Sequence, residues 1–280
     1  MTTTLRHGDR SQDVRVLQQR LNLAGASLFV DGLFGDATET AVRTYQSNKG
    51  LVADGIAGPK TLAALTGADC SALLSNATLT AAAARLGIEL ATILAVNEVE
   101  SLGAGFLDNG KPKILYERHI MYRQLARPRS PEDDAVALQA HADELATSQP
   151  NLVNPRAGGY AGGTAEHQRL AHARLIDDAC ALESASWGAL QVMGYHAVRL
   201  GYSSVQEFAA RMAKDENEQF EAFVRFLEAD PALLKALKAK KWAVFAKGYN
   251  GPDYQRNLYD IKLERAYKRH AAGCPVPEAA

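Results

Sequence analysis

The sequence has few cysteines, almost no net charge and no long hydrophobic run. Its 280 residues include 3 cysteines, far apart and odd in number, which excludes a disulfide framework and a CxxC metal site. The 31 basic and 32 acidic residues nearly cancel, which argues against a whole-chain electrostatic grip on nucleic acid or anionic lipid. No apolar run approaches the roughly 20 residues that span a bilayer, and the first residues lack the apolar core of a signal peptide.

What is present is an ordinary globular composition, with 47% hydrophobic and 22% charged residues. The length allows one large or two ordinary domains. A stretch of small polar residues separates two regions of different periodicity, and we expect a linker there. The predicted divisions are a small domain over 1–67, a linker over 68–77, a larger domain over 78–272 and a flexible tail over 273–280.

The first region predicts a small bundle of three helices. Apolar residues recur at helical spacing, and the expected helices cover 13–21, 38–46 and 59–65. One phrase occurs twice, as Asp31-Gly32-Leu33-Phe34-Gly35 before the second helix and as Asp54-Gly55-Ile56-Ala57-Gly58 before the third. The glycines permit tight turns, and each Asp can accept hydrogen bonds from the turning backbone. The region has no cluster of catalytic or ligating side chains, so it is either a structural cap or a binding module.

The first region resembles the peptidoglycan-binding three-helix repeat domain of cell-wall hydrolases. The resemblance runs over nearly all of residues 5–65, through GDRSQDVRVLQQRLN, VDGLFGDATETAVRTYQSNKG and LVADGIAGPKTLAAL. It implies that the bacterial cell wall is the ligand. It also implies that the binding groove lies near Asp31, Phe34 and Asp54 and the turns that follow them.

The second region reads as mostly helical. A hairpin is expected over 106–117, because Asn109-Gly110 is a strong turn signal between alternating residues. A loop rich in Gly and Pro covers 151–163, where Tyr160 could stack on a sugar if the loop walls a cleft. The expected helices are 81–101, 131–147, 164–182, 187–200, 205–213, 215–229, 231–238, 240–248 and 253–269. One hairpin in a helical body makes this an α+β domain.

Two glutamates near the end of the expected helix 81–101 are candidates for a general acid. Glycoside hydrolysis needs a carboxylic acid that stays protonated near neutral pH, so its pKa must be raised by partial burial. On a helical wheel, Glu100 belongs to the buried face and Glu98 to its margin. Gly103 and Gly105 then end the helix beside the hairpin. We therefore expect Glu100 to be the general acid.

This reasoning does not decide which residue supplies a second catalytic carboxylate. Glu117, at the end of the second hairpin strand, could hold a water or stabilise positive charge on the sugar ring, or it could pair with Arg118. Glu183 could line a cleft or take part in a network at a helix end. Neither His167 and His172 nor Cys180 has the spacing or setting of a zinc peptidase or a nucleophile, and we interpret them as structural or surface residues.

The second region resembles the N-acetylmuramidase domain of modular phage endolysins, over roughly 78–269. The segments that carry the resemblance are AVNEVESLGAGF, KPKILYERH, NPRAGGY, SWGALQVMG, FAKGYNGPDY and YDIKL. Their order also follows the motifs of goose-type lysozymes and lytic transglycosylases, although the latter usually carry a Leu-Met-Gln type phrase where this chain has Ala189-Leu190-Gln191. The resemblance implies a mainly α, lysozyme-like catalytic domain with a small β-hairpin beside the small N-terminal bundle. It implies Glu100 as the acid, with Ser101, Gln191, Tyr249 and Asn250 beside the substrate.

Together these features predict a phage endolysin that hydrolyses the β-1,4 bond between N-acetylmuramic acid and N-acetylglucosamine in peptidoglycan. The alternatives are a lytic transglycosylase that forms 1,6-anhydro ends, a non-catalytic wall-binding phage protein, and a chitinase-like enzyme. We expect no metal or organic cofactor, no nucleic-acid partner, no integral membrane segment and a monomer. The basic run that begins at Lys235 is a solvated helix face or a site for anionic wall or outer-membrane polymer. By the family, we expect synthesis in the host cytoplasm and release to the periplasm and wall at lysis.

Overall fold

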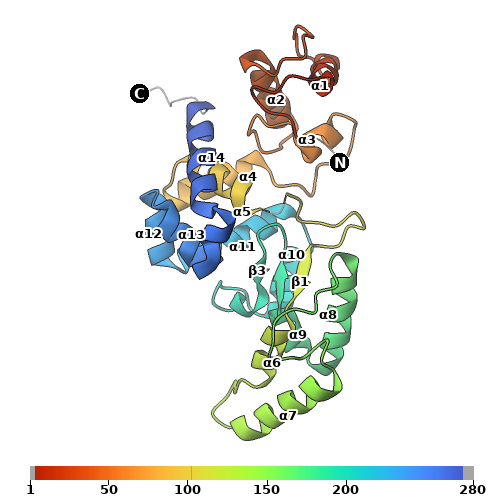
Figure 1. Cartoon of the computed structure of the whole chain (residues 1–280), viewed down its shortest axis with the longest axis vertical. Coiled ribbons are helices and arrows are strands. Elements are labelled where there is room, and N and C mark those ends of the chain that lie inside the picture. Colours follow the sequence, from red (N-terminus) through yellow and green to blue (C-terminus); the bar gives the residue numbers. More distant parts are fainter. Residues whose placement is uncertain (1–3, 102, 274–280) are drawn as a thin grey trace. The chain divides into compact units, whose positions relative to one another are not determined.

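A computed structural model gives the structure of the chain and describes residues 4–101 and 103–273 (Figure 1). Of the tail predicted over 273–280, only Gly273 falls among the described residues, as the last residue of α14. Helices dominate, and a three-stranded sheet is the one sheet in this part of the chain, so the fold is mainly α as the sequence predicts. The elements are α1 (Gln12–Leu23), α2 (Asp36–Asn48), α3 (Pro59–Ala64), α4 (Asn76–Leu86), α5 (Leu90–Glu100), β1 (Ile114–Tyr116), α6 (Arg118–Leu125), α7 (Ala135–Ser148), α8 (Thr164–Ile176), α9 (Asp178–Glu183), β2 (Ala185–Trp187), β3 (Val192–Met193), η1 (Gly194–His196), α10 (Val205–Met212), α11 (Glu216–Glu228), α12 (Pro231–Lys238), α13 (Trp242–Asn250), η2 (Pro252–Asn257) and α14 (Tyr259–Gly273).

The chain divides by its internal contacts into two compact units. The first contains residues 1–99 and 235–280, and the second contains residues 100–234. The division falls between Val99 and Glu100, so α5 contributes almost all of its length to the first unit and its last residue to the second. Each unit is described separately below.

Within the first unit, α1, α2 and α3 form the three-helix module that the sequence predicts. Ser11 caps α1 by accepting a hydrogen bond from the Val14 N–H, and Pro59 occupies the first turn of α3. Residues of the segment predicted as a linker lie against this module, since Cys70 and Leu73 pack on its core. The buried apolar core consists of Leu5, Val14, Leu17, Leu21, Phe34, Val42, Tyr45, Leu51, Ala57 and Ala64.

The single helix predicted over 81–101 is wrong, because α4 and α5 are separate helices. Gly87 ends α4 in the left-handed conformation at φ 62°, which glycine adopts without steric cost. Just before α5, the Glu89 carboxylate accepts hydrogen bonds from Lys240 at 2.6 Å and from Tyr267 of α14 at 2.7 Å. No single described helix is long and apolar enough to cross a membrane; α4 and α5 pass that test only as a pair, bent by 117°.

The sheet lies in the second unit and corrects the predicted strand pairing. The turn at Asn109-Gly110 forms as predicted, with the Gly110 N–H donating to the Leu107 carbonyl at 2.9 Å. Phe106, however, makes one isolated bridge to Pro112. β1 instead pairs with β2 in antiparallel register, with Leu115 opposite Ser186, and β2 pairs with β3. The hairpin of the sheet is therefore β2–β3, and β1 is added from a distant part of the chain.

The helix predicted over 187–200 is wrong, because this stretch holds β3, η1 and a tight turn. Gly188 and Gln191 both have positive φ, at 75° and 52°, which no α-helix tolerates. The Gln191 side chain closes the turn: its Oε1 accepts from Ser186 Oγ at 2.7 Å, and its Nε2 donates to the Gly188 carbonyl at 2.8 Å. A local network thus overrides the helical pattern of the sequence.

The helix predicted over 164–182 is broken into α8 and α9. Asp177 lies between them in an extended conformation, and its carboxylate caps α9 by accepting from the Cys180 N–H at 2.7 Å. The predictions over 131–147, 205–213, 215–229 and 231–238 are confirmed by α7, α10, α11 and α12 within a few residues. Those helices have clear starts, such as Ser204 and Asp215, whose side chains cap α10 and α11.

Candidate active site

The two glutamates near the end of α5 have different surroundings. Glu98 lies in the first unit and pairs with two side chains of α14, Arg269 at 2.5 Å and His270 at 2.8 Å. Burial acts to raise the pKa of Glu98, but the His270 hydrogen bond and the Arg269 charge outweigh it and lower that pKa. Glu98 is therefore an ionised structural carboxylate. Glu100, the last residue of α5, is 8% exposed.

The glycine-rich exit from α5 is fixed by two side chains of α11. Gly105 donates its N–H to Glu216 Oε1 at 2.8 Å and accepts from Gln219 Nε2 at 3.3 Å. A Cβ on Gly105 would collide with Gln219, so only glycine fits there. Gln219 also accepts from the Ala189 N–H at 2.9 Å. This one buried amide thus joins the segment after Glu100 to the turn between β2 and β3.

Glu117 and Tyr160, predicted separately, lie together in the second unit. Glu117 stands between β1 and α6, and its carboxylate accepts from the Tyr160 hydroxyl at 2.9 and 3.1 Å. His119 Nδ1 lies 3.1 Å from the same carboxylate. Burial and the hydrogen bond to Glu117 raise the pKa of Tyr160, so the phenol keeps its proton and donates. Tyr160 is 48% exposed, which leaves much of its ring open to a ligand.

The glycine-rich loop, residues 156–163, is held from two sides. Glu166, fully buried at the start of α8, accepts from the Ala161 and Gly162 N–H groups at 2.5 and 2.9 Å and pairs with Arg169. Burial raises the pKa of Glu166, but these backbone donors and the Arg169 charge lower it by more. On the other side, the Arg118 guanidinium donates to the carbonyls of Arg156 and Ala157. The loop that carries Tyr160 therefore has a defined position in its unit.

Glu166, Glu216 and Gln219 were missed by the sequence reasoning. Glu166 had one visible signal, an acidic residue in the first turn of a helix that follows a run of glycines. Glu216 and Gln219 sit in the first turn of α11, and their partners are more than a hundred or some thirty residues away. No local sequence pattern predicts partners at such a distance along the chain.

The remaining predicted substrate residues lie as follows. Ser101 is half-buried directly after α5. Gln191 uses both ends of its amide to close the turn described above. Tyr249 and Asn250 end α13 in the first unit, where the Tyr249 ring stacks on Phe245 with a centroid separation of 5.8 Å. The substrate-binding roles of all four stay predictions.

Other candidate groups have structural surroundings. Glu183 forms a two-pronged ion pair with Arg129 at 2.5 and 2.8 Å, in agreement with a network at a helix end. Burial raises the pKa of Cys180 to about 12, so this thiol is unreactive at neutral pH. Among residues 4–101 and 103–273, no three His, Cys, Asp or Glu side chains gather as a metal site requires.

In the three-helix module, two glutamines organise the two repeated turns, which we name the first turn (31–35) and the second turn (54–58). Gln18 Nε2 donates to Asp31 Oδ1, the Leu33 carbonyl and Thr38 Oγ1, and its Oε1 accepts from the Gly32 N–H. Gln46 makes the equivalent bonds in the second turn, with Asp54, Ile56, Thr61 and Gly55. The module is thus an internal repeat in side-chain chemistry as well as in sequence.

The three predicted groove residues of the module differ in accessibility. Phe34 is 0% exposed and supports the first turn from within the core, so a ligand does not reach it. Asp31 is exposed, and the Gln18 hydrogen bond and the Leu33 N–H lower its pKa. Burial raises the pKa of Asp54, against the hydrogen bonds from Ile56 and Gln46.

Comparisons with known proteins match both halves of this description. A family model for N-acetylmuramidase matches residues 89–271, which is well over half of the chain. The chain belongs to the N-acetylmuramidase family. A second model, for a peptidoglycan binding domain, matches residues 10–65, the region of the three-helix module.

Individual relatives of this N-acetylmuramidase cover different shares of the chain. The crystal structure of the endolysin of Burkholderia phage AP3 is similar with a TM-score of 0.87 and 54% identity, over 96% of this chain and 100% of that chain. The zinc D-Ala-D-Ala carboxypeptidase of Streptomyces albus G is 51% identical over 61 residues, 21% of this chain and 24% of that protein. The N-acetylmuramoyl-L-alanine amidase CwlM of Mycobacterium tuberculosis is 50% identical over 54 residues, 19% of this chain and 13% of that protein. The chain thus spans a quarter or less of these curated relatives.

Proposed function

We propose that the chain is a phage endolysin that hydrolyses the β-1,4 bond between N-acetylmuramic acid and N-acetylglucosamine in bacterial peptidoglycan. The observation that carries the proposal is the family match over 89–271 together with the buried Glu100 inside that range. The similarity to a phage endolysin over almost the whole chain supports the same function.

In this mechanism Glu100 is the general acid. A glycosidic oxygen needs a proton as positive charge develops on the sugar ring, and a buried carboxylic acid at a helix end is suited to deliver it. Three other glutamates have structural roles: Glu98 pairs with Arg269 and His270, Glu183 pairs with Arg129, and Glu166 binds the glycine-rich loop. These three are ionised or engaged in ion pairs, which makes them unsuitable as proton donors.

Glu117 is the second carboxylate of the proposal. It activates the attacking water or stabilises the oxocarbenium-like sugar, and the Tyr160 hydroxyl orients it. Because Glu166 and Arg118 hold the loop that carries Tyr160, this orientation does not depend on the substrate. The exposed part of the Tyr160 ring supplies a stacking surface for a sugar.

The three-helix module binds the wall and keeps the catalytic part near its substrate. Linking a binding module to an enzyme raises the effective concentration of the active site at the polymer. We also propose that the protein is made in the host cytoplasm and reaches the wall at lysis, where this tethering keeps the enzyme on its substrate.

The test is mass spectrometry of fragments released from purified Gram-negative sacculi. Wild-type protein and Glu100→Gln are compared, with Glu98→Gln as a control for a nearby glutamate that holds structure. Fragments with reducing N-acetylmuramic acid ends, absent with Glu100→Gln, are the expected result. Ends lighter by one water, as 1,6-anhydro sugar, would make the enzyme a transglycosylase. Sacculi that bind the protein and stay intact would overturn the proposal and leave a wall-binding protein.

A further inference from the structure

The two turns of the three-helix module each border a small hollow, and the two hollows are equivalent by the internal repeat. The first hollow is lined by residues beside the first turn: Arg10, Ser11, Arg15, Asp31, Gly32 and Leu33. The second hollow is lined by the matching Glu39, Arg43, Asp54, Gly55 and Ile56, among others. The match is geometric, because a Cβ on Gly32 would touch Arg15 and Ser11, and one on Gly55 would touch Arg43 and Glu39.

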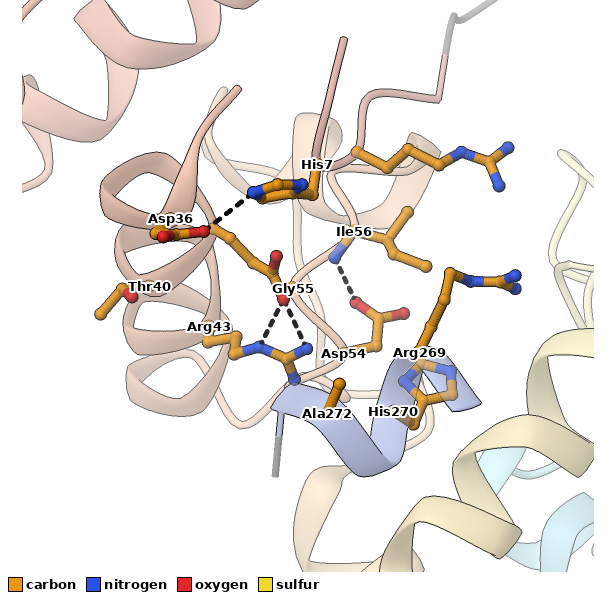
Figure 2. A pocket seen from close by; sticks show the side chains of 12 residues that line it. His7, Asp36, Thr40, Arg43, Asp54, Gly55, Ile56, Arg269, His270 and Ala272 are labelled. Atoms are coloured by element: carbon orange, nitrogen blue, oxygen red, sulfur yellow. Dashed lines mark hydrogen bonds and ion pairs between the residues drawn. The ribbon is translucent and has the colours of Figure 1, made fainter. Parts of the chain in front are cut away.

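Residues of α14 form part of the wall of the second hollow. Arg269, His270 and Ala272 of α14 line it together with the second turn (Figure 2). His270 is 2% exposed, and its electrostatic interaction with Asp54 acts to lower the pKa of that carboxyl. The second hollow is therefore bordered by residues of another helix, whereas the lining of the first hollow comes from residues 10–33 alone.

The two hollows differ in several lining residues, and one of these differences changes the charge beside the matching arginines. In the second hollow Glu39 accepts two hydrogen bonds from Arg43, at 2.7 and 3.2 Å, and neutralises it (Figure 2). Ser11 takes the place of Glu39 in the first hollow, and its hydroxyl caps α1. Arg15 donates to the Val30 carbonyl at 3.2 Å, and its charge contributes to the lowered pKa of Asp31. Among the described residues, neither Arg15 nor Arg10 has a carboxylate within ion-pair distance.

The first hollow thus presents two guanidinium groups in a cavity of about 400 Å³, with the Asp31 carboxylate on its rim. Guanidinium groups bind carboxylates in a planar, two-pronged geometry that lysine cannot reproduce. Because Asp31 repels a second negative charge, the hollow favours a singly charged carboxylate over a phosphate. An ammonium group next to that carboxylate would find its own partner in Asp31.

We propose that the first hollow binds a free carboxylate of the peptide stem of peptidoglycan. The glycan strand offers neutral hydroxyl and acetamido groups, whereas the stem peptide carries carboxylates. In this proposal the three-helix module binds the peptide and the catalytic part binds the sugar. This inference rests on the proposed function, since it names the part of the wall that the module recognises.

The experiment uses the full chain labelled with ¹⁵N and a soluble stem peptide as the probe. Addition of the peptide with a free C-terminal carboxylate should shift the Gly32 and Leu33 amide signals. The same peptide amidated at its C-terminus should bind about tenfold more weakly, the effect of one charge-assisted hydrogen-bonded pair. Equal binding of the two peptides, or shifts confined to other parts of the chain, would overturn the proposal. Tighter binding of glycerol phosphate than of the peptide would also overturn it, and would point to an anionic wall polymer.

Two matched pairs of variants locate the effect. Arg15→Gln should weaken binding of the free peptide about tenfold, while Arg20→Gln, an equal charge change on the same helix outside the hollow, should not. Ser11→Glu places a carboxylate four residues before Arg15, the same spacing as from Glu39 to Arg43, and should weaken binding further than Ser11→Gln, which loses the same helix cap without adding charge. Equal effects within either pair would contradict the proposal.

A separate assay distinguishes this inference from the proposed function. Wild-type protein is incubated with a peptide-free oligosaccharide of alternating N-acetylmuramic acid and N-acetylglucosamine. Cleavage of the oligosaccharide without stem-peptide binding would refute the inference and keep the enzyme. Stem-peptide binding without cleavage would do the reverse.

Discussion

The three-helix module and the region around Glu117 hold their turns with different side chains. In the module, Gln18 and Gln46 each donate three hydrogen bonds and accept one, and both are neutral at every pH. Around Glu117, the glycine-rich loop is held by the carboxylate of Glu166, which must be ionised to accept all its donors. A neutral amide gives a turn that is indifferent to acid. A buried carboxylate gives a loop whose order depends on pH and on the partner Arg169.

The largest effect should come from the glutamate that we assign to chemistry rather than to support. Glu100→Gln should lower turnover on sacculi about 10²–10⁴-fold, because an amide cannot donate the proton. Its melting temperature should stay close to that of the wild type. For Glu98→Gln we expect a lower melting temperature and turnover close to that of the wild type, because Arg269 and His270 lose their charged partner. Turnover that falls equally in both variants would show that the two glutamates do not have separate roles.

Glu166→Gln should produce the next largest effect. It leaves the Arg169 guanidinium, 11% exposed, without a charged partner. One carboxylate oxygen accepts from the two loop N–H groups and the other accepts from the Tyr116 N–H and Arg169, so the new amide nitrogen has to face one of these pairs of donors. We expect a loss of about 3–5 kcal/mol in the local opening free energy. Hydrogen exchange at the Ala161 and Gly162 amides measures it. Glu144→Gln on the exposed face of α7 is the control and should leave those amides unchanged.

The converse substitution tests the module. Gln46→Glu replaces a donor with a carboxylate facing Asp54, so the hydrogen bonds to Asp54 and to the Ile56 carbonyl are lost at neutral pH. The second turn should lose about 1–3 kcal/mol, read from exchange of the Gly55 amide. Acid should restore part of the loss, because a protonated glutamic acid can donate again. Gln19→Glu, on an exposed position of α1, controls for the added charge; similar exchange in both variants would mean that the network does not hold the turn.

The smallest effect is the pH dependence of the wild type, and it has opposite signs in the two regions. The lowered pKa of Glu166 means that its contribution is present above the unfolded value near 4.5 and is lost as pH falls through the folded pKa. The raised pKa of Asp54 means that the second turn is favoured below the unfolded value near 3.8 and weakened as pH rises through the folded pKa. Between pH 5 and 3, the protection factor of the Gly162 amide, which is its exchange rate relative to the intrinsic rate at the same pH, should therefore fall, while the protection factor of the Gly55 amide should not. Parallel changes at both amides would remove the distinction.

The sequence predicts those parts whose causes are local. The helices α10, α11 and α12 follow from apolar periodicity and from caps such as Ser204 and Asp215, and the turn at Asn109-Gly110 follows from its residues. The helix prediction over 187–200 is wrong because the Gln191 side chain closes a turn there, and because Gln219 of another helix fills the space beside Gly188 and accepts from the Ala189 N–H. The break at Gly87 was visible as a glycine, but the apolar pattern runs on across it.

In the candidate site, too, the features with local causes could be predicted and those that depend on distant contacts could not. Glu100 can be chosen from Glu98 by helical geometry, and the ion pairs of Glu98 agree with that choice. That Glu117 and Tyr160 lie together was not predicted, because the loop reaches Glu117 only through backbone bonds to Glu166 and Arg118. In the module, the repeated Asp-Gly phrases are apparent in the sequence. The role of Gln18 and Gln46 was not predicted, because the two glutamines precede their turns by different numbers of residues.

Helix α2 belongs to both repeats at once. Its first turn carries Thr38, which completes the network of Gln18, and its last turns carry Gln46, which begins the next network. α3 carries the completing Thr61 but ends at Ala64, before a third glutamine could begin another network. Each helix is thus both the end of one building block and the start of the next, as in a linear array. A lengthened α3 with a glutamine and a further Asp-Gly turn would extend the array by one block, and so give an engineer a way to set the number of wall contacts on one chain.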